Sequence, residues 1–190
     1  MILSIVAYGD PVLKKVAVEI DTEHPGLDKL IADMFDTMYN AKGVGLAAPQ
    51  VGKSIRLFIV DATPFSVDPE NEEEAALEGF ERIFINPTIT AQTGKEWAFN
   101  EGCLSIPKIR EDVMRKSNLS ISYLNEYFEP VTEHFKGLAA RIIQHEYDHI
   151  EGKLFTDRIS PLRKRLLQRK LSDISKGRIE VDYKMKFTSK

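Results

Sequence analysis

The chain has 190 residues, of which 43% are hydrophobic and 29% are charged, and it contains a single cysteine, Cys103. This length is typical of one domain with a substantial core, and the composition excludes the disordered and fibrous classes. One cysteine cannot form an intrachain disulfide, so a disulfide-stapled secreted scaffold is also excluded. Three roles stay open for Cys103: core packing, nucleophile or metal ligand.

The net charge of −3 conceals an uneven distribution. Residues 158–190 contain eleven Lys or Arg and three acidic residues, a balance of +8, so residues 1–157 carry −11. The N-terminus lacks the cationic start of a signal peptide, and no apolar run approaches the roughly 20 residues that cross a bilayer. We therefore expect a cytoplasmic protein with neither a membrane nor DNA as a partner.

The first strong helix signal covers residues 25–40, where Pro25 suits the first turn and Gly43 follows the end. Apolar residues recur there at intervals of three and four and so share one helix face; they are Leu27, Leu30, Ile31, Met34 and Met38. Segments rich in β-branched and aromatic residues then predict strands. These strands cover residues 55–60, 82–90, 119–124 and 130–135, and residues 125–129 are expected to connect the last two as a hairpin.

The acidic segment 68–81, with seven acidic residues and no basic ones, is expected to be a solvated loop. A second helix is predicted over residues 137–150, and a third over residues 160–176, where Ser160 and Pro161 form a typical helix start. Strands and helices do not alternate regularly. We predict an α+β fold in which antiparallel sheets pack around a central helix, residues 137–150, with a further helix near the C-terminus.

The sharpest chemical signal is HEYDH at residues 145–149. Positions i and i+4 of a helix lie one turn apart on the same face, so His145 and His149 can reach one metal ion. Glu146 lies beside them, close enough to touch a metal-bound water, as in the HExxH pattern. The alternative is a polar helix with two surface histidines. It is disfavoured because the two histidines continue the apolar stripe of Leu138 and Ile142.

Two histidines do not complete a metal site. The third histidine of an extended protease pattern would fall at Phe155, which cannot ligate, whereas Glu151 and Asp157 could each supply a carboxylate at unusual spacing. The remaining soft donor is Cys103, within EGCLS at residues 101–105 in a predicted loop. A lone cysteine is usually inert. A Cys–His–His set is nevertheless a sound three-ligand shell with a fourth position for water.

A third block, GVGLAAPQ at residues 43–50, follows the first predicted helix. The simplest interpretation is a turn from helix to strand, because glycine permits unusual backbone angles. The block lacks the spacing and the lysine of a phosphate-binding loop. Gln50 at its end is a neutral side chain that could donate a hydrogen bond to a developing oxyanion.

GVGLAAPQ at 43–50, EGCLS at 101–105 and QHEYDH at 144–149, in this order, resemble the three signature motifs of the peptide deformylase family. The resemblance extends from the N-terminus to about Ser160, and it says least about the segment 61–82 and the C-terminal tail. It implies a metal-dependent hydrolase that removes the N-formyl group from the formyl-methionine of nascent polypeptides and releases formate. A metal-bound water would be the nucleophile.

The resemblance also implies a role for each matching residue. The metal ligands would be Cys103, His145 and His149. Glu146 would be the general acid/base, and the oxyanion donors would be Gln50 and the backbone N–H of Leu104. The substrate would contact Val44, Gly45, Gly102, Leu138 and Ile142, with Phe99 and Arg141 as further candidates for the methionine pocket. Glu101 and Arg110 would form a supporting ion pair. Family members use Fe²⁺ and can function with Ni²⁺, Co²⁺ or Zn²⁺.

The basic C-terminal segment has two interpretations. Residues 1–159 are predicted to form the catalytic part of the domain, and residues 160–190 a basic helix and tail of the same domain. The helix has apolar residues on one broad side and cationic residues elsewhere, so it could simply dock on the body by its leucines. The alternative is an electrostatic contact with ribosomal RNA, which would suit a co-translational substrate.

Two other functions compete with the deformylase interpretation. The first is a zinc endopeptidase of the HExxH type, with a carboxylate as third ligand and a dispensable Cys103. The second is a non-catalytic nucleic-acid-binding module that depends on the basic tail. Replacement of Cys103 separates the first alternative from the deformylase, because only the deformylase should lose its metal. Replacement of Glu146 tests the second, because a binding module would be unaffected.

Overall fold

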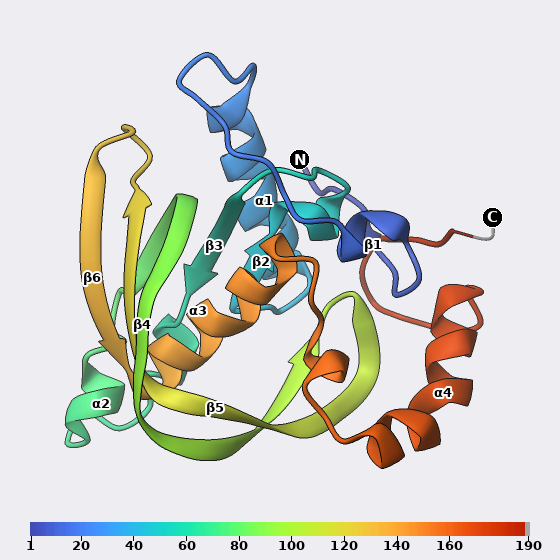
Figure 1. Cartoon of the computed structure of the whole chain (residues 1–190). Coiled ribbons are helices and arrows are strands. Elements are labelled where there is room, and N and C mark those ends of the chain that lie inside the picture. Colours follow the sequence, from blue (N-terminus) through green and yellow to red (C-terminus); the bar gives the residue numbers. More distant parts are fainter. Residues whose placement is uncertain (189–190) are drawn as a thin grey trace.

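The computed structural model describes residues 1–188, so the last two residues of the predicted 160–190 tail lie outside the described part (Figure 1). An antiparallel five-stranded sheet has the order β2-β3-β4-β5-β6. Its strands are β2 (Gly45–Ala47), β3 (Leu57–Asp61), β4 (Glu81–Cys103), β5 (Ile106–Leu124) and β6 (Pro130–Lys136). Two short strands, β1 (Ile5–Val6) and β7 (Met185–Lys186), pair in parallel, which the sequence did not predict.

The predicted helices are confirmed with small shifts at their ends. They are α1 (Leu27–Asn40), α3 (Gly137–Ile150) and α4 (Pro161–Ser175). Pro25 lies before α1 rather than in its first turn, because Gly26 adopts a left-handed conformation with φ of 69° at the N-cap. The acidic segment contains a short helix, α2 (Glu72–Ala75), whose N-cap Asn71 accepts backbone hydrogen bonds from Glu73 and Glu74.

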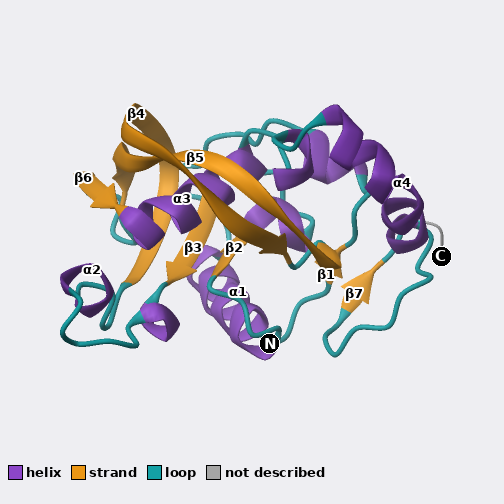
Figure 2. Ribbon diagram, turned by 90° about the horizontal axis from the view of Figure 1, so that it is seen from below, coloured by secondary structure: helices purple, strands orange, loops and turns teal. Residues whose placement is uncertain are grey.

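The sheet lies between two helices because the side chains of a strand alternate between its faces. On β3, Phe58 and Val60 belong to the core cluster that contains residues of α3. Leu57 and Ile59 belong to the cluster that contains the apolar face of α1. This arrangement confirms the predicted α+β fold, with α3 at the centre of the molecule (Figures 1 and 2).

The hairpin of β4 and β5 is much longer than the predicted strands at 82–90 and 119–124. It spans Glu81 to Leu124 with register shifts that bend it, and it curves past α3 (Figure 1). Cys103 is therefore the last residue of β4 rather than a loop residue, and Leu104 and Ser105 form the turn into β5. The bend carries this turn to the side of α3 that bears the two histidines.

The C-terminal part of the chain packs on the body. In α4, Leu167, Leu171 and Ile174 are buried in a third core cluster, which also contains Leu13 and Val113. The return of β7 to β1 then brings residues 181–183 close to the β4–β5 turn. Within residues 1–188, no helix combines the length and the apolar character needed to span a membrane.

Candidate metal centre and active site

Three potential metal ligands converge at one point. His145 and His149 lie one turn apart on α3, and Cys103 reaches them from the end of β4. Their ligand atoms all lie within 4.8 Å of one another, and Cys103 Sγ is 3.3 Å from His149 Nε2. The other carboxylates considered from the sequence lie in ion pairs, Glu151 with Arg56 and Asp157 with Lys14 and Lys164.

The donors suit a divalent transition metal. A thiolate and two imidazoles are ligands that Fe²⁺, Co²⁺, Ni²⁺ and Zn²⁺ accept. Glu101 Oε2 lies 2.9 Å from His145 Nδ1, which leaves Nε2 of the same ring for a metal. Burial lowers the pKa of His149 well below its ordinary value, so this imidazole is neutral and can ligate.

Glu101 is held by two buried arginines and not by Arg110, which corrects the predicted ion pair. Arg115 donates to both carboxylate oxygens of Glu101, at 2.6 and 2.9 Å, and Arg141 donates to Oε1 at 2.9 Å. Arg110 instead donates from Nε to Asn100 Oδ1 at 2.9 Å. The reason is the strand register. Arg110 lies opposite Gly102, so its side chain is on the other face of the hairpin from that of Glu101.

Glu146 is buried beside the ligands, with an exposed fraction of 4%. Its Oε2 has no hydrogen-bond partner among the described residues. Burial raises the pKa of Glu146 to about 7, so it can both accept and release a proton near neutral pH. A Cβ atom at Gly45 would lie 2.5 Å from Oε1 of Glu146, so only glycine lets β2 approach this carboxylate so closely.

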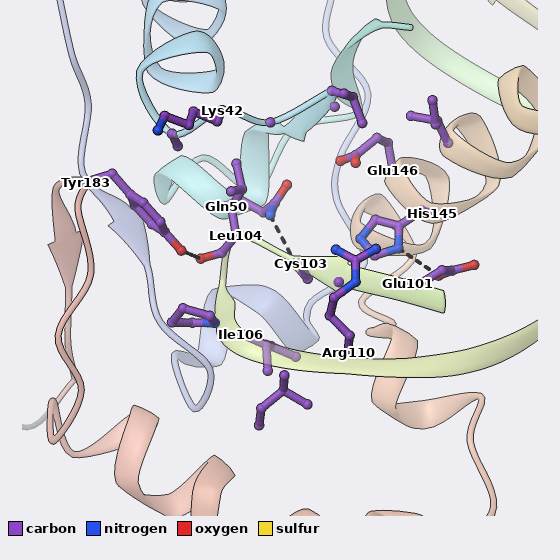
Figure 3. A pocket seen from close by; sticks show the side chains of 18 of the residues that line it. Lys42, Gln50, Glu101, Cys103, Leu104, Ile106, Arg110, His145, Glu146 and Tyr183 are labelled. Atoms are coloured by element: carbon purple, nitrogen blue, oxygen red, sulfur yellow. Dashed lines mark hydrogen bonds and ion pairs between the residues drawn. The ribbon is translucent and has the colours of Figure 1, made fainter. Parts of the chain in front are cut away.

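Gln50 is also buried, and its amide has a defined orientation. Its Oε1 accepts a hydrogen bond from the backbone N–H of Ala47 at 2.9 Å. The NH₂ group therefore faces the site, where Nε2 lies 3.4 Å from Cys103 Sγ (Figure 3). Nε2 also lies 3.4 Å from Ser105 Oγ. This is the orientation that a donor to a developing oxyanion needs.

A cavity of about 520 Å³ adjoins the ligands. Its walls include most of the substrate residues expected from the sequence, namely Val44, Gly45, Gly102, Ile142, Phe99 and Arg141. Leu138 is not among the residues that line this cavity, and its contact with the substrate stays a prediction. It lies one turn before Ile142 on α3, and there it packs against the core between helix and sheet. Arg141 stacks on Trp97 and Phe99, with its guanidinium carbon 4.5 and 5.8 Å from the ring centroids.

Sequence reasoning missed one wall of this cavity. Val181, Asp182 and Tyr183 line it from the C-terminal segment, and the Tyr183 hydroxyl donates to the Leu104 carbonyl at 2.7 Å (Figure 3). Burial, together with the proximity of Cys103, raises the pKa of Tyr183, so its hydroxyl stays protonated. No motif marks these residues, because only the return of the chain through β7 brings them here.

Comparison with known proteins agrees with this geometry. The sequence model of polypeptide deformylase matches residues 2–165. The chain belongs to the polypeptide deformylase family. It is 59% identical over 189 residues to the peptide deformylase of Christiangramia forsetii, and this alignment covers 98% of the present chain and 96% of the relative. It is 58% identical to that of Flavobacterium johnsoniae, over 100% of this chain and 97% of that one.

Solved structures of the family share the fold. The peptide deformylase from Legionella pneumophila superposes with a TM-score of 0.79 at 37% identity, over 94% of this chain and 98% of that one. The one from Thermotoga maritima gives 0.74 at 38% identity, over 85% of this chain and 99% of that one. The chain is therefore a hydrolase that removes the N-formyl group from nascent peptides, in a family of metalloenzymes.

Proposed function

We propose that the enzyme removes formyl groups from N-terminal formyl-methionine by a metal-dependent hydrolysis, with Fe²⁺ held by Cys103, His145 and His149. Ni²⁺, Co²⁺ or Zn²⁺ could replace iron at the same ligands. The observation that carries this proposal is the convergence of one thiolate and two imidazoles beside the unpartnered, buried oxygen of Glu146. A buried carboxylate oxygen without a partner is costly, and a water held at the site would satisfy it.

The side chains around the ligands supply the proton transfers and the oxyanion contacts. A divalent ion bound there would lower the pKa of a water molecule and polarise the formyl carbonyl. Glu146 takes the proton from the attacking water as its oxygen bonds to the formyl carbon. Gln50 Nε2 and the Leu104 N–H then donate to the carbonyl oxygen as it becomes negative. When the C–N bond breaks, Glu146 gives the proton to the departing α-amine, so the products are formate and a free N-terminus.

The edge of the five-stranded sheet offers a place for the peptide backbone. β2 is the first strand in the sheet order and pairs only with β3 among the described strands. The backbone at Val44 and Gly45 therefore borders the cavity at an open sheet edge, where an extended peptide can add as a further strand. Gly102 also lines the cavity, and the apolar side chains of Ile142 and Phe99 suit a methionine side chain.

The decisive experiment measures formate release from a formyl-Met-Ala peptide by anaerobically purified enzyme loaded with Fe²⁺ or with Ni²⁺. We expect turnover that stops when a chelator removes the metal. An unblocked peptide with an internal methionine should not be cleaved, and its cleavage would favour the endopeptidase alternative. Absence of formate from the fully loaded enzyme would contradict the proposal.

We also propose that residues 1–159 carry the catalysis and that residues 160–190 complete the same domain with a surface for ribosomal RNA. The exposed side chains of Arg165, Arg169 and Lys170 on α4 support this contact. A substrate on nascent chains also favours action in the cytoplasm.

Truncation at residue 159 would remove buried core residues of α4, so charge reversal is the better test. R165E/R169E/K170E should lose co-sedimentation with ribosomes at low salt. Reversal of three exposed lysines elsewhere, K15E/K53E/K95E, should leave it intact. Equal co-sedimentation of both variants would contradict the contact.

A further inference from the structure

The turn that follows the metal ligand Cys103 is held at two consecutive carbonyl groups. The Tyr183 hydroxyl donates to the carbonyl of Leu104 at 2.7 Å (Figure 3). The backbone N–H of Tyr8 donates to the carbonyl of Ser105 at 2.8 Å. Both donors lie outside the hairpin that contains the turn. The conformation of Leu104 therefore depends on segments from the two ends of the chain.

The same two segments are joined to each other by the β1–β7 pair. Ile5 N–H donates to the Lys184 carbonyl at 2.9 Å, and Ala7 N–H donates to the Lys186 carbonyl at 2.9 Å. Tyr183 immediately precedes this ladder. Its ring also packs against the cluster that contains the apolar face of α1. The hydroxyl of Tyr183 is thus placed by backbone pairing on one side and by ring packing on the other.

Tyr183 and β7 lie beyond the part of the chain that the family model matches, which ends at residue 165. The relatives from Christiangramia forsetii and Flavobacterium johnsoniae align over 98% and 100% of this chain. The Thermotoga maritima structure covers only 85% of it. The contact at Leu104 therefore joins a residue inside the matched range to Tyr183 outside it, and Tyr183 is not part of the three signature motifs.

We propose that Tyr183 is a positioning residue for deformylation, which aims the N–H of Leu104 at the oxyanion by holding the Leu104 carbonyl. This inference rests on the proposed function, in which that N–H is a donor. The Leu104 N–H and the Leu104 carbonyl belong to two neighbouring peptide planes that meet at the Leu104 Cα. Cys103 is held in β4 on one side and the carbonyl is held by Tyr183 on the other, so few rotations about this Cα remain to the N–H. A donor that is already oriented needs no reorganisation when charge develops, and its benefit falls in the transition state.

The test is Tyr183→Phe, which keeps the ring and its packing and removes only the hydroxyl. A neutral hydrogen bond contributes about 0.5–1.5 kcal/mol, so kcat on formyl-Met-Ala should fall about 2- to 12-fold. KM and bound metal should stay at wild-type values, because the Tyr183 ring and the other cavity walls are kept. The urea midpoint should fall only slightly, because a single neutral hydrogen bond is lost. Tyr127→Phe is the matched control, since Tyr127 is 74% exposed on the β5–β6 hairpin, and it should have wild-type kcat.

A second measurement tests the effect of the Tyr183–Leu104 hydrogen bond without using catalytic turnover. In the ¹⁵N spectrum of the Zn²⁺-loaded protein, Tyr183→Phe should shift the Leu104 amide resonance, and Tyr127→Phe should not. Wild-type kcat in Tyr183→Phe, or an unmoved Leu104 resonance, would overturn the inference. So would a lower urea midpoint accompanied by metal loss, which indicates a merely structural role. Absence of formate release by the wild type would contradict the proposed function instead, and the spectrum would still decide whether Tyr183 positions Leu104.

Discussion

The carboxylate of Glu101 connects the β4–β5 hairpin to α3 through His145, with 2.9 Å between Oε2 and Nδ1. The same carboxylate accepts hydrogen bonds from Arg115, which also donates to Asp148 at 2.7 Å. Asp148 lies between His145 and His149 in the sequence of α3. The hairpin that supplies Cys103 and the helix that supplies the histidines are thus fixed to each other by buried charged groups, and this fixes the ligand geometry.

Replacement of Glu101 should weaken metal binding. Glu101→Gln keeps the size of the side chain but loses the charge that orients His145, and such changes typically reduce metal affinity 10- to 100-fold. Competition with a metal indicator measures the loss. Glu111→Gln is the control, because Glu111 lies opposite Glu101 in the strand register and pairs with Arg163 instead. Equal affinities in both variants would mean that Glu101 does not orient the ligand.

Cys103→Ala and Glu146→Gln should separate metal binding from turnover. Cys103→Ala removes one of three ligands, so the purified protein should lose both metal and formate release. Glu146→Gln keeps the ligands but removes the proton acceptor, and general acid/base groups typically contribute 10²- to 10⁴-fold. We therefore expect stoichiometric metal by atomic absorption with kcat reduced by about that factor. Retention of metal by Cys103→Ala would instead favour the endopeptidase with a carboxylate ligand.

Gly45→Ala should impair catalysis through a steric effect on Glu146. The added Cβ would lie between 2.5 and 2.8 Å from the carboxylate and the Cγ of Glu146, so this side chain must move. We expect kcat to fall at least tenfold, because Glu146 is displaced from its working position. Metal content should be retained, because the atoms nearest to the added Cβ all belong to Glu146 and not to Cys103, His145 or His149. Wild-type kcat would show that Glu146 can act from a displaced position.

Packing of α4 on the body can be tested with two leucines of the same helix. Leu171 is 3% exposed, whereas Leu166 is 64% exposed. Leu171→Ala should lower the free energy of unfolding by about 2–4 kcal/mol, because it leaves a cavity in the core. Leu166→Ala should change it by less than about 0.5 kcal/mol. Urea unfolding followed by circular dichroism measures both. Similar losses in the two variants would contradict the observed packing.

Asp157 should contribute stability that disappears in acid. Burial acts to raise its pKa, but Lys14 and Lys164 outweigh this and hold the pKa at about 2, below the ordinary 3.8. A carboxyl whose pKa is lowered on folding stabilises the native state above its unfolded pKa. This contribution is lost as the pH falls from about 3.8 to about 2.

The matching variant is Asp157→Asn. It should be less stable than wild type at pH 7 by less than about 1 kcal/mol, because these ion pairs are partly exposed. The difference should shrink as the pH falls below about 3.8 and disappear below about pH 2, and salt should reduce it at pH 7. Urea titrations at several pH values measure it. A difference that grows as the pH falls would contradict the ion-pair assignment.

Local sequence patterns were enough to predict the helices, because the pattern that specifies a helix lies within a few consecutive turns of the chain. The stripes of α1, α3 and α4 repeat within a few residues, and the HExxH spacing places two imidazoles on one helix face whatever the rest of the chain does. The three motifs also identified the family. They predicted Cys103, His145 and His149 as the metal ligands, and the structure brings these side chains together.

Other features depend on which distant segments meet. The partner of Glu101 is Arg115 and not Arg110, because strand register and side-chain alternation place Arg110 on the other face. Leu138 and Ile142 lie one turn apart on the same face of α3, and only the packing of this helix on the sheet decides that Ile142 lines the cavity. Tyr183 reaches Leu104 only because β7 pairs with β1 at the opposite end of the chain. Such contacts are determined by tertiary packing, since no local pattern encodes the pairing of residues that lie 79 positions apart.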